Sequence, residues 1–528
     1  MILALLACTG SQPQQPPESA DRGLVPLEDG RLLRRMSLDL RGRLPSVEEL
    51  ERVEQDPAQL ELLRDEMLED AAFEERLRHL LAEQWLTRAD RFNIGTWELG
   101  LDASRRHELA WSVGSEPVVL MAWVAANDLP WSETVTADYT LANELLLELY
   151  PLEPLDQEPS AEQPWVRARY SDGRPPAGVV STNGLWWRYF SAPNNYNRSR
   201  AAAVSRLLLC EDYLTRPVQF SAEGLADLDP ELEATKEVPS CRSCHATLDP
   251  LAAGFFGYWV YDLYDPIEAV AYHPERELLG PSFLDMEMGW FGTPVSSPAE
   301  LFAQIPHDPR FASCAVERAA RSMWRREPGL EDFQTLDRLR ADFEDEGLLM
   351  KQLLADLTDT PDYQVGALTE DALEDEQRQA THRVMSPELL ATSVEQVTGL
   401  RWEMEGFDPF RDDIEGYRIL AGGLDGHAVT EPLHSPSLSQ GLVLKRLSQA
   451  AGQHMVEQGQ LSLVGPEDAV WAEQVTRLSL QLHAQEPSAE DLVALEELWL
   501  AVEASSDAQQ AWASLVSVLL RDDRFWSY

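Results

Sequence analysis

A short run of sulfur and imidazole side chains is the most chemically informative feature of this 528-residue sequence. Cys241 and Cys244 stand three residues apart, and His245 follows directly. On a helical turn, cysteines at this spacing face the same side, so both thiols can reach the two vinyl groups of one porphyrin. The histidine then lies under the iron as its proximal ligand. The pattern predicts covalent attachment of one haem c.

Three other uses of the same two cysteines compete with this prediction. A thioredoxin-like dithiol needs a βαβ context, which the sequence lacks. A zinc site needs two more ligands, and the sequence contains no second closely spaced pair. A disulfide between the two motif cysteines is the third alternative. The candidates for the additional zinc ligands are Cys210, Cys314, His273 and His307.

The second axial position of the iron has several candidate ligands. Met288, followed by a glycine and about forty residues beyond the motif, is our first choice because thioether sulfur is a common ligand in cytochromes. A six-coordinate haem mainly passes electrons, whereas an open position can bind and activate small oxidants. The alternatives are Met286, Met323, His273, His307 or an open position.

Two arginines are candidates for contacting the same cofactor. Arg198 and Arg200 lie in a basic stretch, and a guanidinium matches the geometry of a carboxylate. We therefore predict that they bind the haem propionates, although they could equally pair with carboxylates of the protein itself.

The chain is strongly acidic. It has 43 Lys and Arg against 91 Asp and Glu, which gives a net charge of -48. Such a surface repels nucleic acid and anionic lipid headgroups and attracts basic proteins. Nucleic acid is therefore excluded as a partner.

The N-terminus predicts a lipid anchor. Leu5-Leu6-Ala7-Cys8 resembles a bacterial lipobox, in which the cysteine is lipidated, and a polar linker suited to a tether follows it. The apolar run is short and lacks a preceding Lys or Arg, so either the true start lies upstream or the run is fortuitous. No other stretch has about 18 uninterrupted apolar residues, so we expect membrane contact only through the lipid. These features predict a periplasmic or outer-membrane-associated lipoprotein.

The five cysteines can be assigned without a remainder. If Cys8 carries lipid and the motif cysteines carry haem, Cys210 and Cys314 remain as one pair. An oxidising compartment permits a disulfide between them. Because the pair flanks the motif in sequence, this bond would connect the helix before the motif to the helix after it.

Hydrophobic periodicity predicts a mainly α, multi-helical fold. Helix-start signals occur at Ser46 with Glu49, which form a capping box, and at Ser386 followed by proline. The sequence has no glycine-rich phosphate loop and no alternating βαβ pattern, which disfavours a nucleotide-binding fold. Residues 178–190 could be irregular or one short strand. The expected helices include 32–40, 117–126, 139–150, 199–209, 298–324, 329–357 and 509–520.

These elements predict a cytochrome c-like haem module between N-terminal and C-terminal helical regions. The expected regions are a lipoprotein-type signal remnant (1–8), a polar linker (9–25), an N-terminal helical region (26–150), a haem-binding region (165–265), a post-haem helical region (266–368) and a C-terminal helical region (380–528).

The flanks of the motif resemble the haem segment of the planctomycete-type cytochrome c family. In that family the motif is followed by an acidic residue, a proline and an apolar–glycine step, which correspond here to Asp249, Pro250 and Gly254. The aromatic run 255–259 departs from the family pattern, in which more apolar and acidic residues follow the glycine. Other similar segments are 34–44, 84–86, 127–144, 197–200, 209–210, 311–326 and 417–425.

The resemblance covers most of the chain in patches and implies an exported protein with one covalent haem c. Its flanking segments belong to domains of unknown function, so it implies a cofactor and a location more than a reaction. The leading hypothesis is electron transfer in the periplasm or at the outer surface, with an unknown redox partner protein. One alternative is a haem-dependent oxidoreductase, or the redox subunit of one, acting on a carbohydrate-derived substrate. The other is a surface protein with a structural haem. Whether the protein is an enzyme stays open.

Overall fold

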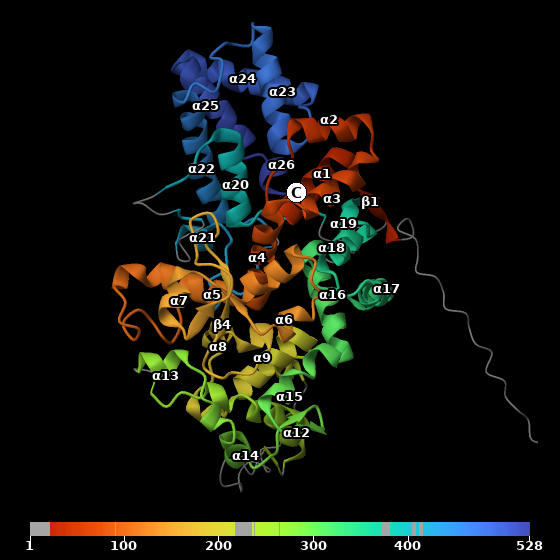
Figure 1. The fold of residues 1–528 in the computed structure, drawn as a ribbon. Helices are drawn as coiled ribbons and strands as arrows, with labels where there is room; N and C mark the ends of the chain where they lie inside the picture. Colours follow the sequence, from red (N-terminus) through yellow and green to blue (C-terminus); the bar gives the residue numbers. More distant parts are fainter. Residues whose placement is uncertain are drawn as a thin grey trace, which may run out of the picture.

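The computed structural model describes residues 22–528 except 90, 217–234, 237, 263–264, 371–380, 404–407, 411–415 and 434. Within these residues the protein is mainly α-helical and multi-helical, as predicted, and its few short strands pair antiparallel. Figure 1 shows an elongated arrangement, with the C-terminal helices at one end and α12 (Pro239–Ala253), which carries the cysteine motif, at the other. Cys8, the predicted site of lipidation, lies outside the described residues.

The elements follow one another as a long series of short and medium helices. The N-terminal part contains α1 (Asp29–Arg41), α2 (Val47–Gln55), α3 (Gln59–Leu68), α4 (Ala71–Trp85), α5 (Arg106–Ala126), α6 (Glu133–Thr136) and α7 (Glu144–Leu149). The central part contains α8 (Asn183–Arg188), α9 (Arg198–Leu209), α12, α13 (Pro266–Val270), α14 (Leu279–Leu284), α15 (Pro298–Phe302), α16 (Pro309–Trp324), α17 (Phe333–Asp345), α18 (Met350–Thr358) and α19 (Pro361–Gln364). The C-terminal part contains α20 (Pro387–Thr398), α21 (Tyr417–Leu420), α22 (Leu438–Glu457), α23 (Ala469–His483), α24 (Ala489–Ser505), α25 (Ala508–Leu519) and α26 (Asp523–Trp526).

The strands form three small antiparallel sheets. β1 (Leu24–Pro26) pairs with β7 (Val365–Leu368), and β5 (Gly289–Trp290) pairs with β6 (Thr293–Pro294). The third sheet has the order β2 (Thr140–Ala142), β4 (Val166–Tyr170), β3 (Leu152–Pro154).

Local sequence signals predict several helix starts correctly. Ser46 and Glu49 form the expected capping box at the start of α2. Ser386 caps α20, whose first residue is a proline. The expected helices 32–40, 199–209 and 509–520 correspond to α1, α9 and α25.

Two predictions of local structure are wrong. Residues 139–150 do not form one helix, because β2 pairs with β4 before Asn143 caps the short α7. Residues 178–190 form neither a strand nor an irregular segment but a short 3-10 turn followed by α8.

Three longer predictions have the wrong bounds. The stretch 329–357 is divided into α17 and α18 at Gly347 and Leu348, whose φ angles of 81° and 63° are left-handed and end a helix. The stretch 298–324 is divided into α15 and α16, because Asp308 caps a new helix that begins at a proline. The helix expected over 117–126 begins earlier, at Arg106, and continues through Pro117.

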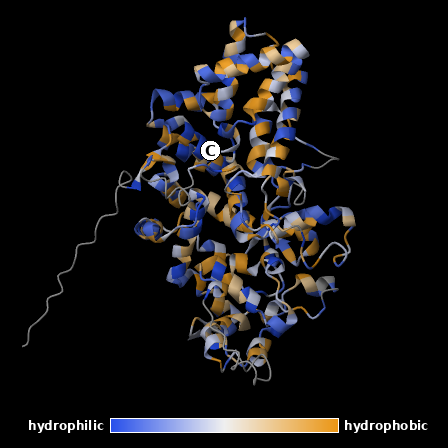
Figure 2. Cartoon of the chain, turned by 180° about the vertical axis from the view of Figure 1, so that it is seen from behind, coloured by the Kyte–Doolittle hydropathy of each residue, from blue (hydrophilic) through white to orange (hydrophobic). Residues whose placement is uncertain are grey.

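Two hydrophobic cores lie under this helical surface. The larger core runs from the N-terminal helices through α12 and α16 to α19, and the smaller one is built from residues 385–528 together with Leu38 and Leu44. Helix α1 contributes to both, with Leu33 in the larger core and Leu38 in the smaller. Figure 2 shows hydrophobic and hydrophilic residues interspersed along the helices. Among the described residues one helix, Ala103–Ala126, is long and apolar enough to cross a membrane, and 83% of its apolar window is buried in the protein.

A buried carboxylate connects α1 to distant parts of the chain. Asp39 is 1% exposed and accepts hydrogen bonds from the hydroxyls of Tyr528, at 2.8 Å, and Tyr363, at 3.2 Å. The guanidinium of Arg383 also donates to it, and that of Arg76 lies 3.7 Å away. One carboxylate on the first helix thus compensates two buried cations from other elements.

The neighbouring arginines of α1 bind backbone carbonyls of the same distant segments. Arg35 donates to the carbonyls of Tyr363 and Val365, both at 2.7 Å. Arg34 donates to the carbonyls of Ser527, at 3.2 Å, and Phe525. Helix α1 therefore holds β7 and the residues around α26 in place through charged side chains.

We predict that Asp39→Asn lowers the free energy of unfolding by about 3–5 kcal/mol, because it leaves buried guanidinium groups without a charge partner. Urea unfolding followed by circular dichroism measures this change. The control is Asp138→Asn, since Asp138 pairs with Arg169 on the surface and should cost less than about 1 kcal/mol. Equal losses in the two variants would contradict the role given to Asp39.

Candidate functional site

The cysteine motif lies on the N-terminal half of α12. Pro239 lies in the first turn of this helix, where its missing N–H leaves no hydrogen bond unmade. Cys241 and Cys244 follow on the helix, and both thiols are free and partly exposed. The alternative of a disulfide between them is thus not formed, and the thiols are presented together by a helix.

His245 is held by a carboxylate one turn further along α12. Its Nδ1 lies 2.8 Å from Oδ1 of Asp249, which is 1% exposed. An ionised carboxylate can only accept, so Nδ1 carries the proton and donates it. With the proton held on Nδ1, Nε2 is the ring nitrogen left to bind a metal.

Arg198, at the start of α9, holds the same carboxylate from the other side. Its Nε donates to Oδ1 of Asp249 at 2.7 Å, and a terminal nitrogen donates to Oδ2 at 2.8 Å. Although burial alone would raise the pKa of Asp249, the hydrogen bonds from Arg198 and His245 hold this pKa below its usual value. Asp249 is therefore ionised at neutral pH and connects α9 to the histidine of α12.

Arg200 has a different environment. It is buried, donates to Oδ1 of Asn197 at 2.5 Å and lies 6.0 Å from the ring centre of Tyr258. Burial lowers the pKa of Arg200 to about 10. Both Arg198 and Arg200 thus have partners within the protein, and propionate binding by either stays a prediction.

Four aromatic rings stack beside this group. The rings of Phe256 and Trp259 are almost parallel, at 3°, with centres 5.1 Å apart. Phe283 of α14 lies 5.9 Å from Trp259 and 6.0 Å from Tyr196. The guanidinium of Arg198 lies 5.6 Å from the Tyr196 ring centre. The stack forms an aromatic cluster near the carboxylate that holds the histidine; Phe256 is fully buried in it, and Phe283 is 41% exposed.

Met288 lies in the segment that packs against α12. It is buried and immediately precedes β5. A side chain added at Gly289 would stand 3.4 Å from Cβ of Pro250. Upstream, a side chain at Gly280 would overlap the backbone of Ala253, so α14 also touches α12. The segment with the first-choice methionine therefore lies beside the motif helix.

The other proposed iron ligands are placed less favourably. Met323 is fully buried within α16, and the ring of His273 lies 3.1 Å from the carbonyl oxygen of Glu268. His307 is exposed at the end of a short 3-10 turn, and Met286 is half-buried just before Met288. The positions of these four side chains give no reason to prefer any of them to Met288 as an iron ligand.

Cys210 and Cys314 form the disulfide that the sequence predicts. Their Cα atoms are 5.2 Å apart, and the bond joins the C-terminal end of α9 to α16. Their sulfurs are thereby engaged and do not complete a zinc site. Over the part of the chain that the structure describes, no group of three or more His, Cys, Asp or Glu could hold a metal ion.

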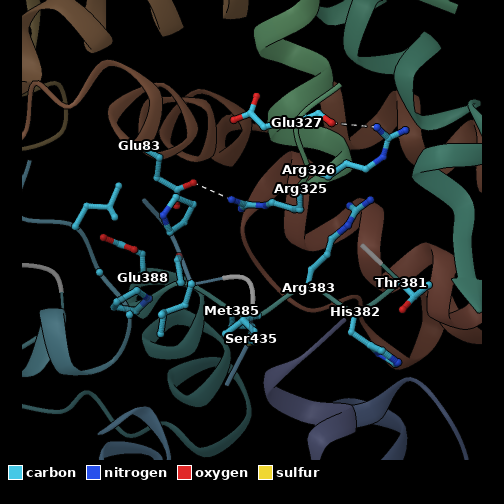
Figure 3. Close-up of a pocket in the computed structure, with 18 of the residues that line it drawn as sticks. Glu83, Arg325, Arg326, Glu327, Thr381, His382, Arg383, Met385, Glu388 and Ser435 are labelled. Carbon is cyan, nitrogen blue, oxygen red and sulfur yellow. Dashed lines mark hydrogen bonds and ion pairs between the residues drawn. The ribbon is translucent and has the colours of Figure 1, made fainter. Parts of the chain in front are cut away.

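A cavity of about 1100 Å³ lies elsewhere in the molecule. Residues 325–331 and 381–388 form two of its walls, as Figure 3 shows. Its arginines are already paired: Arg325 with Glu83 at 2.8 Å and Arg418 with Glu388 at 2.7 Å are two examples. No residue of α12 lines this cavity, so a molecule bound there would not meet the cysteine motif.

No protein-family model, curated protein or solved structure matches this chain. A function for this chain is therefore argued from the geometry around α12 alone.

The motif spacing did not predict every residue of the site. The contact between His245 and Asp249 could have been predicted, because residues four positions apart face each other on a helix. The four stacked rings come from separate segments, and their meeting depends on how α9 and α14 pack on α12. Sequence spacing carries no information on that packing.

We predict that replacing Cys210 and Cys314 together by serine lowers the free energy of unfolding by about 2–5 kcal/mol, because the unfolded chain loses a cross-link across a long loop. Urea unfolding of oxidised and reduced protein measures the effect. A reductant should destabilise the wild type and leave the double variant unchanged. Peptide mapping that finds either thiol free in protein purified without reductant would contradict the assignment.

Proposed function

We propose that this protein is an exported mono-haem c-type cytochrome that transfers electrons. Cys241 and Cys244 would form the thioether links, and His245 would bind the iron. The observation that carries the proposal is the hydrogen bond from His245 to the buried Asp249, because it leaves Nε2 ready for a metal. Two free thiols on the same helix supply the attachment points.

The surroundings of the motif fit a haem c. The stacked rings of Tyr196, Phe256, Trp259 and Phe283 make the surroundings of the motif apolar, and the exposed ring of Phe283 could contact a porphyrin. Met288, buried in the segment beside α12, would be the second side chain to hold the iron. When bound, haem supplies a one-electron ferric–ferrous couple. The chain's own residues would hold the porphyrin, orient the imidazole and keep water from the iron.

Electron transfer is favoured over catalysis by where the motif lies. Helix α12 lies at one end of the elongated molecule in Figure 1, where a partner can approach closely. The large cavity is not next to α12, so it offers no substrate site at the iron. A net charge of -48 favours a basic redox partner protein.

The proposed location is the periplasm or the outer membrane, with Cys8 as the lipid anchor. The Cys210–Cys314 disulfide supports a compartment outside the reducing cytosol.

We expect protein matured in a cytochrome c maturation system to keep haem through acid–acetone extraction and to give the pyridine haemochrome band of two thioether links. The double variant Cys241→Ala/Cys244→Ala should lose covalent haem, because both links are gone, and His245→Ala should lose the native low-spin spectrum. The double variant Cys210→Ser/Cys314→Ser is the control and should retain haem. Wild-type protein without haem, while a control cytochrome matures, would overturn the proposal.

We expect Met288→Ala to abolish the sulfur-to-iron charge-transfer band of the ferric protein, since that band requires a thioether ligand. The control is Met286→Ala, two residues away, which should keep the band. Loss of the band only in Met286→Ala would move the ligand to that residue. A high-spin wild type would instead favour the haem enzyme over the electron carrier.

A further inference from the structure

The carboxylate of Asp249 lies between two groups that both donate hydrogen bonds to it. On one side it accepts a hydrogen bond from Nδ1 of His245, which lies 2.8 Å from Oδ1 of Asp249. On the other it accepts two hydrogen bonds from Arg198, at 2.7 Å and 2.8 Å. Imidazole, carboxylate and guanidinium thus form one connected chain, with the carboxylate almost fully buried at its centre.

We propose that Asp249 and Arg198 together set the reduction potential of the haem, Asp249 by lowering it and Arg198 by moderating Asp249. This inference rests on the proposed function, since it requires iron on Nε2 of His245. Both are positioning residues, because they act on the iron through the imidazole and do not touch it.

The direction of each effect follows from the hydrogen bonds. A carboxylate that accepts a hydrogen bond from Nδ1–H pulls this proton partly away from the ring. The ring then holds more electron density, and Nε2 becomes a stronger electron donor to the iron. A stronger donor stabilises the ferric state more than the ferrous state, which lowers the potential. Arg198 withdraws negative charge from the same carboxylate and so weakens its pull on the proton. Burial strengthens both effects, because the local dielectric constant is lower than that of water.

A purely structural role for these residues predicts something else. Arg198 and Asp249 also connect the start of α9 to α12, so either substitution would loosen the site. Loosening alone would shift the potential in the same direction for both variants. Opposite shifts distinguish electronic control from structural support.

The test compares Asp249→Asn and Arg198→Gln in the full-length haem-loaded protein by spectroelectrochemistry. We expect Asp249→Asn to raise the potential and Arg198→Gln to lower it. A tenfold change in the ferric–ferrous equilibrium is about 59 mV for a one-electron couple, and we expect shifts of about this size. The g values of the ferric haem in electron paramagnetic resonance, which respond to the donor strength of the imidazole, should move in opposite directions as well.

The double variant shows whether Arg198 acts through Asp249. If it does, Arg198→Gln should shift the potential much less when Asp249 is already Asn, since the carboxylate it moderates is gone. An equal shift in both backgrounds would mean that Arg198 acts on the iron directly through space, which overturns the inference. The control is Asp285→Asn, which removes one exposed carboxylate that pairs with Lys236 and should leave the potential unchanged.

Two further outcomes separate the inference from the proposed function. Wild-type protein that takes up no haem overturns both. Protein that carries haem but shows unchanged potentials, or shifts of the same sign, overturns the inference and leaves the cytochrome intact. If Asp249→Asn does not fold, Arg198→Lys, which keeps the charge but loses the paired hydrogen bonds, should lower the potential less than Arg198→Gln does. No shift in either arginine variant would overturn the inference by itself.

Discussion

The buried charge of Asp39 is the interaction on which the arrangement of the whole chain depends. A carboxylate inside a protein is stable only when cations and donors surround it. The partners of Asp39 are Arg76 of α4, Tyr363 of α19, Arg383 before α20, and Tyr528. The arginines next to Asp39 on α1 reach the same segments through backbone carbonyls. One short helix, apolar on the faces that enter both cores and charged between them, therefore determines how the two cores meet.

A second buried carboxylate, with fewer partners, supports the motif helix. Asp249, like Asp39, is a buried carboxylate that joins a helix to a guanidinium from another element. In the first case the partners are structural, whereas in the second one of them is an imidazole with a free ring nitrogen. If the protein carries haem as proposed, this buried carboxylate would orient the histidine that binds the iron.

The sequence predicts local features better than contacts between distant segments. The capping box at Ser46, the proline start of α20 and the Cys210–Cys314 pair all follow from neighbouring residue types or from cysteine counting. By contrast, β2 pairs with β4 across more than twenty residues, and that pairing breaks a helix that periodicity alone would predict over 139–150. The aromatic stack is of the same kind, since Tyr196 and Phe283 meet only because α9 and α14 pack on one helix. The motif on α12 is visible in the sequence, and its support by Arg198 is visible only in three dimensions.

The contacts between Arg34 and the carbonyls near α26 join residues 493 and 491 positions apart in sequence. During synthesis the first helix emerges long before its partners, so its buried guanidinium groups have no carbonyls to bind until nearly all of the described chain is present. Such distant contacts make folding slow, because the long intervening loop must be closed before they contribute any stability. The larger core, whose residues lie almost entirely between 32 and 363, can form before that point, so the contacts of α1 with the end of the chain are among the last to be made.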